Sequence, residues 1–198
     1  AAAADWWLTV ERDSVVLGPA GAAEAFDSLD VLVPMARASR DAVSAEVTAS
    51  DGAALVLRGS VLTSSELSGM ARGTADQSVS YAIDREQFGQ PIGGFQAVKH
   101  RCADMATHAE AAECQTRYAA LALAAGQDDA PFHVHAARII AARAAVDNAQ
   151  VNVQNHGGIG FTWEHTAHRY VTRSRLVASQ FGDTTSHLTA MLVAAAPA

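Results

Sequence analysis

The sequence is poor in basic residues for its length. Lysine and arginine together number 14 against 21 aspartates and glutamates in 198 residues, which gives a formal net charge of −7 at pH 7. Proteins that bind nucleic acids neutralise phosphates with clustered cationic side chains. The charge balance therefore argues against nucleic acid as a partner.

The sequence also lacks a long apolar run. No stretch approaches the roughly 20 residues of a membrane-spanning helix, and no basic-then-apolar segment of the signal-peptide type opens the chain. We therefore expect a soluble, cytoplasmic protein without a membrane span. The chain opens on Ala1 rather than methionine and has no capping pattern before Trp6, so we expect it to begin inside a domain.

Cysteine is scarce. Cys102 and Cys114 are the only two, and both fall in one apparently continuous helical stretch. Their separation along such a helix is roughly 18 Å, which is far beyond the reach of a disulfide bond. We expect both to be small, buried, reduced side chains.

What the sequence does contain divides into two parts. Residues 1–50 have the β-branched and alternating character of short strands, predicted at 6–10, 14–17, 29–33 and 43–47. Four short strands without a closing set do not make a stable independent sheet. Residues 1–50 are therefore predicted to be the remnant of a β-domain.

Residues 51–198 are predicted to form a helical bundle. Ser50-Asp51 is a plausible helix cap, and helices are expected over about 52–84, 95–125, 129–156, 165–178 and 183–194. The first is rich in small residues, which let helices approach closely. The fold class is thus mainly α, an up-down four-helix bundle preceded by a partial β-domain.

The second and third of these helices carry apolar residues at alternating spacings of three and four, which is typical of bundle helices. In the second helix this stripe comprises Val98, Cys102, Met105, Ala109, Ala112, Thr116, Ala119 and Leu123. In the third helix it comprises Ile139, Ala142, Val146, Ala149 and Val153.

Two breaks between helices concentrate special residues. Arg85 lies at the end of the first helix, and Gly93-Gly94 open the second, so a cation lies close in sequence to a helix N-terminus that attracts anions. At the second break, residues 154–161 hold three glycines in four positions, which allows close backbone approach to a ligand. A tight turn with Arg85 in solvent and an ordinary glycine-rich helix stop are the alternative interpretations.

Taken together, these two stretches resemble signatures of the acyl-CoA dehydrogenase family. Residues 81–100, YAIDREQFGQPIGGFQAVKH, resemble the signature between the first two C-terminal helices, and Asp104-Met105 continue it. Residues 154–161, QNHGGIGF, resemble the second signature at the right separation. The resemblance covers roughly residues 55–183.

The resemblance implies an FAD-dependent oxidoreductase that dehydrogenates an acyl-CoA thioester, with a bundle that assembles into dimers and tetramers. It places Arg85 and Phe88 near the FAD pyrophosphate and adenine of a neighbouring subunit. Further positions near the adenosine half are matched by Gln96, Gln154, Gly157 and Gly158. The isoalloxazine ring would be held mainly by a middle domain, most of which this sequence does not contain.

The family's catalytic glutamate has no counterpart here. At its commoner position the sequence has Phe181, followed by Gly182, and at the other position it has Gly59. Glu66 lies about 10 Å farther along the helix than Gly59, which is too far for its carboxylate to reach the same reacting carbon. Asp183, two residues after Phe181 in the junction before the last helix, could move into the position of the base, although its simplest role is to cap that helix.

We therefore expect no catalytic residue in this chain, which resembles the non-catalytic subunit of actinobacterial heteromeric acyl-CoA dehydrogenases that act on steroid side-chain thioesters. Its partners would be a homologous subunit and the acyl-CoA. The alternative is a degenerate homologue that serves as a structural or interaction module without flavin. No metal is expected, because the eight histidines show no convergent third ligand.

Overall fold

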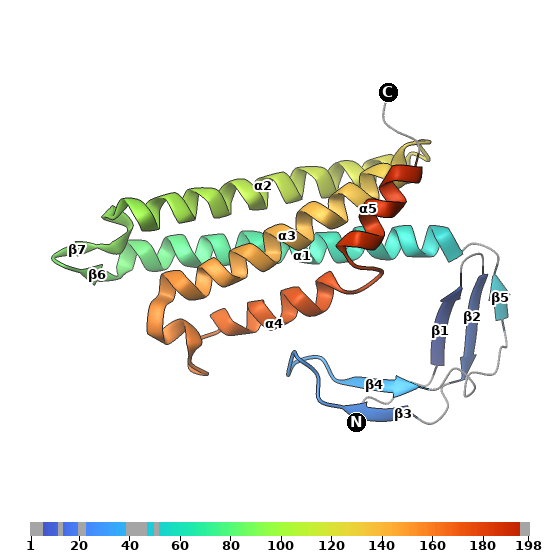
Figure 1. Cartoon of the computed structure of the whole chain (residues 1–198), viewed down its shortest axis with the longest axis horizontal. Helices are drawn as coiled ribbons and strands as arrows, with labels where there is room; N and C mark the ends of the chain where they lie inside the picture. The colour runs from blue at the N-terminus through green and yellow to red at the C-terminus, as the bar shows by residue number, and fades with distance from the viewer. Residues whose placement is uncertain (1–5, 12–13, 20–22, 39–46, 50–51, 195–198) are drawn as a thin grey trace. The chain divides into compact units, whose positions relative to one another are not determined.

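The computed structural model describes residues 6–11, 14–19, 23–38, 47–49 and 52–194 (Figure 1). The chain divides into two compact units, Ala1–Gly59 and Ser60–Ala198. The division falls in the first turns of the first long helix. The predicted cap at Ser50-Asp51 lies outside the described residues, so the predicted domain boundary there stays a prediction.

The first unit holds two small antiparallel sheets. One has the strand order β1-β2-β5, where β1 is Trp6–Glu11, β2 is Ser14–Pro19 and β5 is Val47–Ala49. The other pairs β3, Ala23–Phe26, with β4, Met35–Ala38. The strands expected at 6–10 and 14–17 are confirmed, whereas β3 and β4 were not predicted. Most of the expected strand at 43–47 lies outside the described residues.

The strand predicted at 29–33 is wrong, because this segment is the turn between β3 and β4. The Asp30 carboxylate accepts the backbone N–H of Leu32 at 3.0 Å, and its carbonyl accepts that of Val33 at 2.9 Å. An aspartate that bonds the backbone two residues on offers the chain an alternative to strand pairing. The apolar Leu29, Val31 and Leu32 are more than half exposed, so their hydrophobicity did not indicate burial.

The second unit is the predicted helical bundle. Its helices are α1 (Gly52–Asp84), α2 (Gln96–Ala124), α3 (Ala130–His156), α4 (Ala167–Ala178) and α5 (Thr184–Val193). In Figure 1, α1 and α2 run in opposite directions along the bundle, α3 returns beside them and α4 reverses again. Each expected helix is confirmed to within two residues at its ends. Within the described residues, none of the helices has the length and apolar character needed to cross a bilayer.

The core is built mainly from alanines, which let the helices pack closely. The stripe predicted on α2 is buried from Cys102 to Ala119, as expected. On α3 the predicted stripe is confirmed at Ala142, Ala149 and Val153, which are buried, and wrong at Ile139 and Val146, which are only half-buried. The core face also includes Arg138 and Asn148, which are almost fully buried. Asn148 joins three helices, since its amide nitrogen donates to the carbonyls of Ala71 at 3.0 Å and Met105 at 2.9 Å.

The two cysteines differ in their surroundings. Both lie on α2 as free thiols, and Cys102 is buried as expected. The expectation of burial is wrong for Cys114, which is exposed beside the Glu110 carboxylate. Burial raises the pKa of the Cys102 thiol, so this side chain is an inert part of the core.

Candidate functional site

The turn between α1 and α2 is a short hairpin. Strand β6, Glu86–Gln87, pairs with β7, Gln90–Pro91, through a two-residue loop. Both loop residues have left-handed backbone, with φ of 54° at Phe88 and 78° at Gly89, as two-residue hairpin loops require. Glycine adopts this conformation freely, whereas phenylalanine does so at a cost. The loop thereby places the Phe88 ring at the tip, where it is 93% exposed.

Arg85 lies at the base of this hairpin. Its backbone N–H donates to Tyr81 at 2.9 Å and its carbonyl accepts from Ile92 at 2.8 Å, so the backbone is held at both ends. The guanidinium side chain is exposed. Gly93 lies so close to α1 that an added Cβ would approach the Ala82 carbonyl oxygen to 3.0 Å. The local backbone is therefore fixed while the cation faces outward.

Helix α2 begins directly after the hairpin without a side-chain cap. The N-cap residue Phe95 has no side-chain acceptor, and the exposed Gln96 is the first helical residue. Free N–H groups at such a helix start carry a partial positive charge and bind anions. The expected combination of a cation and a helix N-terminus is thus present in one segment.

The second segment is the end of α3 and the following 3₁₀ helix, Gly157–Phe161. Gly157 has a φ of 63°, and neither it nor Gly158 has another atom within 4 Å of the position of a Cβ. Gly160 is instead packed tightly, because a Cβ there would lie 2.7 Å from the Val153 carbonyl oxygen. The backbone at Gly157 and Gly158 is therefore accessible to a ligand, whereas Gly160 packs against the end of α3. Gln154 is exposed on the last turn of α3.

The two segments lie at the same end of the bundle (Figure 1). They are joined by ring contacts: the Tyr81 and His156 rings stack with centroids 4.3 Å apart, and the His165 ring lies tilted against His156 at the same centroid distance. The His156 Nδ1 atom lies 2.8 Å from the Asn152 carbonyl, and burial lowers the pKa of His156. These ring contacts were not predicted from the sequence, although Tyr81 and His156 fall within the two signatures.

The gathered groups suit an extended ligand that carries phosphates. Arg85 and the start of α2 supply positive charge, and the bare backbone at Gly157 and Gly158 allows close approach. The exposed amides of Gln96 and Gln154 can donate and accept hydrogen bonds. This end of the bundle therefore fits the diphosphate and adenosine half of FAD on chemical grounds.

The junction between α4 and α5 holds Phe181, the residue at the expected position of the base. Phe181 has a left-handed backbone with φ of 58°, is 45% exposed, and precedes Gly182 with φ of 112°. A phenylalanine ring cannot accept a proton. The left-handed backbone at both residues makes this a sharply bent segment.

The two carboxylates considered as replacements are both engaged elsewhere. Glu66 pairs with Arg173 of α4 at 3.3 Å. Asp183 caps α5, as expected, because its Oδ1 atom accepts the backbone N–H of Ser186 at 2.8 Å and its hydroxyl at 2.7 Å. These hydrogen bonds lower the pKa of Asp183. Its carboxylate is thus held as an acceptor at the start of a helix.

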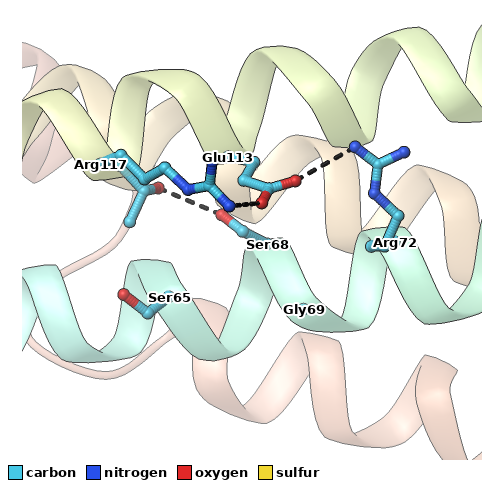
Figure 2. Close-up of a pocket in the computed structure, with 7 residues that line it drawn as sticks. Ser65, Ser68, Gly69, Arg72, Glu113 and Arg117 are labelled. Carbon is cyan, nitrogen blue, oxygen red and sulfur yellow. Dashed lines mark hydrogen bonds and ion pairs between the residues drawn. The ribbon is translucent and has the colours of Figure 1, made fainter.

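A hollow of about 310 Å³ lies between α1 and α2 (Figure 2). Its lining residues are Ser65, Ser68, Gly69, Arg72, Glu113, Thr116 and Arg117. Glu113 pairs with both Arg72, at 3.1 Å, and Arg117. Arg72 also pairs with Glu110 at 2.5 Å, and this pairing lowers the pKa of Glu110. Because these charges neutralise one another, we assign no ligand to this hollow.

The two histidines near the start of α3 have separate surroundings. His133 contacts Gln115 and Asp129, whereas His135 contacts His187 of α5. In the part of the chain that the structure describes, no three histidine, cysteine, aspartate or glutamate side chains converge in a way that could hold a metal ion.

Comparison with known proteins identifies the family. The family described as acyl-CoA dehydrogenase, C-terminal domain, matches residues 57–196. The acyl-CoA dehydrogenase FadE34 of Mycobacterium tuberculosis is 38% identical over 182 residues, which are 89% of this chain and 24% of that protein. IpdE2 of the same organism, also an acyl-CoA dehydrogenase, is 40% identical over 116 residues, which are 58% of this chain and 34% of that protein.

Solved structures share the fold. Butyryl-CoA dehydrogenase from Megasphaera elsdenii superposes with a TM-score of 0.80 at 21% identity, over 90% of this chain and 50% of that one. A variant of the Tcur3481-Tcur3483 steroid ACAD gives a TM-score of 0.83 at 24% identity, over the same shares of the two chains. The chain thus spans only part of each relative. The resemblance seen in the two signatures is confirmed, and the chain belongs to the acyl-CoA dehydrogenase family of FAD-binding flavoproteins.

Proposed function

We propose that this chain is a subunit of an FAD-dependent acyl-CoA dehydrogenase that completes the FAD site of a homologous partner subunit and supplies no catalytic glutamate of its own. One observation carries the proposal. Both signature segments lie at one end of the bundle with Arg85, Phe88, Gln96 and Gln154 exposed, while Phe181 stands at the expected position of the base.

Each residue at that end has a distinct role in the proposal. The Arg85 guanidinium pairs with the pyrophosphate, and the Phe88 ring packs against the adenine. The side-chain amides of Gln96 and Gln154 bond the adenosine half, and Gly157 and Gly158 let the backbone approach it. Bound FAD supplies the hydride acceptor for dehydrogenation of the acyl-CoA.

The exposure of Phe88 supports a site shared with a partner. Its ring is 93% exposed at a turn whose left-handed backbone disfavours a phenylalanine. Its ring meets the Phe95 ring edge to face with centroids 6.1 Å apart, but at 93% exposure this contact buries little of it. Backbone strain at such a position is typical of functional sites. Contact with another subunit and its cofactor would explain why a phenylalanine ring lies at this exposed position.

The proton abstraction that accompanies hydride transfer is assigned to the partner. Removal of the proton beside the thioester carbonyl needs a carboxylate at the reacting carbon. In this chain, the Asp183 carboxylate caps the start of α5 and the Glu66 carboxylate pairs with Arg173.

We extend the proposal to steroid side-chain thioesters as the acyl-CoA substrate. This extension is supported by the resemblance noted above and by the steroid ACAD among proteins of the same fold.

The visible absorption spectrum tests the proposal. The chain is purified alone and with a co-expressed homologous acyl-CoA dehydrogenase subunit, and acyl-CoA thioesters from butyryl-CoA to steroid side-chain thioesters are added. We expect oxidised flavin in the complex and its bleaching by one of the thioesters. Absence of flavin from both preparations would refute the proposal and favour the structural module.

A further inference from the structure

Arg138 is a buried cation of the bundle. It lies on α3 with 1% of its surface exposed, and its Nη2 atom donates to the carbonyls of Ala178 at 3.2 Å and Gln180 at 2.8 Å. These carbonyls end α4, where the helix dipole is negative. The Nη1 atom has no hydrogen-bond partner among the described residues. Arg138 therefore ties the α4–α5 junction to α3.

His187 joins α5 to the same cation. It is 4% exposed and is the one buried side chain among the described residues of α5. The Arg138 Nε–H donates to His187 Nε2 at 3.4 Å, and His187 Nδ1 lies 3.0 Å from His135 Nδ1. Because Nε2 is an acceptor, the neutral His187 carries its proton on Nδ1 and donates it to His135. This arrangement uses both nitrogens of a neutral His187 ring.

We propose that Arg138, His135 and His187 form a buried positioning cluster that holds α5 and the junction at residues 181–183 in place only while both imidazoles are neutral. A proton added to His187 Nε2 removes the acceptor for Arg138 and places a second positive charge beside a buried guanidinium. Since His187 is the one buried side chain among the described residues of α5 and the rest are partly or fully exposed, loss of this contact releases the helix. The cluster operates with or without flavin, so it does not depend on the proposed function.

The charged groups around His187 favour this behaviour. Arg138 and His135 face it from α3, and both disfavour a charged ring. A backbone hydrogen bond with Gly182 and the Asp183 carboxylate, both from the junction, act in the opposite direction, but that carboxylate is exposed and bonded to Ser186. Burial is the largest cause, and together these effects lower the pKa of His187 from 6.5 to about 4. Burial also lowers the pKa of His135.

Amide hydrogen exchange on the full chain tests the cluster. Exchange is followed at residues 184–193 and 102–119 at about pH 7.5 and about pH 4.5, corrected for the intrinsic pH dependence of exchange. We expect the protection of α5 to fall about tenfold or more at the lower pH while that of α2 changes little. Equal protection of α5 at both pH values would overturn the proposal.

Two variants separate the titration from general loosening. In His187→Gln the side chain does not titrate, so the pH-dependent step in α5 protection disappears; His108→Gln, at an exposed site on α2, keeps the step. A step that persists in His187→Gln contradicts the proposal. Should His187→Gln not fold, NMR titration of the wild-type imidazoles decides, because a His187 ring that protonates near pH 6.5 while α5 stays protected would also contradict it.

Discussion

The rings of Tyr81 and His156 stack with their centroids 4.3 Å apart and an interplanar angle of 27°. This contact connects the last turn of α1 to the last turn of α3. It therefore fixes the exposed Arg85 and the open glycines after His156 within one rigid end of the bundle. Neither ring is proposed to touch the cofactor.

Removal of the Tyr81 ring should destabilise this end. We expect Tyr81→Leu to lower the free energy of unfolding by about 1–2 kcal/mol, since the stacking and part of the burial are lost. Tyr81→Phe keeps the ring and should stay within about 0.5 kcal/mol of wild type. Urea denaturation measures both. An equal loss in the two variants would mean that the phenol oxygen, and not the stack, supplies the stability.

Arg85 should affect the cofactor without affecting the fold. In the complex with the partner subunit, we expect Arg85→Gln to weaken FAD binding by about tenfold or more, because one charge-assisted contact to the pyrophosphate is lost. The thermal midpoint of the chain alone should not change, since the side chain is exposed. Arg143→Gln, at an exposed arginine of α3, serves as the control. Equal FAD affinity in both variants would show that Arg85 does not contribute to the FAD site.

Asp183 should matter for stability and not for catalysis. Asp183→Ala removes the cap of α5 and should cost about 1 kcal/mol, whereas Asp183→Asn keeps an acceptor and should cost a few tenths. We expect Asp183→Asn to keep the turnover of the complex. Loss of dehydrogenation with flavin retained would instead identify Asp183 as the base and make the chain a complete enzyme.

The buried histidines should make the chain sensitive to acid. Because the pKa of His187 is about 4 in the folded chain against an ordinary 6.5, the unfolded chain binds more protons between these values. The free energy of unfolding should be highest above pH 6.5, fall by roughly 3 kcal/mol as the pH is lowered to about 4, and change little through this group at still lower pH. The lowered pKa of His135 and of His156 acts in the same direction. Denaturation curves across this range that showed constant or rising stability toward acid would contradict this account.

The helices were predictable because their signals are local. Proline near the start of α3 and glycine after its end mark the boundaries of that helix, and the stripe on α2 is apolar or small throughout. The core face of α3 was predicted only in part, because Arg138, Asn148 and Asn152 also lie on it. A hydrophobic pattern assigns such residues to the surface, whereas here each of the three side chains donates a hydrogen bond to another element.

The candidate site was predictable only in part. The two segments were found from Arg85 and from the glycines after His156, but their position at one end of the bundle depends on α1 and α3 running in the same direction, antiparallel to α2. The stack on His156 and the cluster at His187 join residues far apart in the sequence. No spacing rule predicts such contacts. The turn at Asp30 was missed because its apolar neighbours have the pattern of a strand.

The most direct test of the account is single-turnover bleaching of flavin in the complex after the partner subunit's catalytic glutamate has been replaced by glutamine. If this chain supplies no base, the variant complex should keep its oxidised flavin spectrum and lose bleaching by the acyl-CoA thioester. Bleaching at the wild-type rate would show that a group on this chain removes the proton, and would contradict the account.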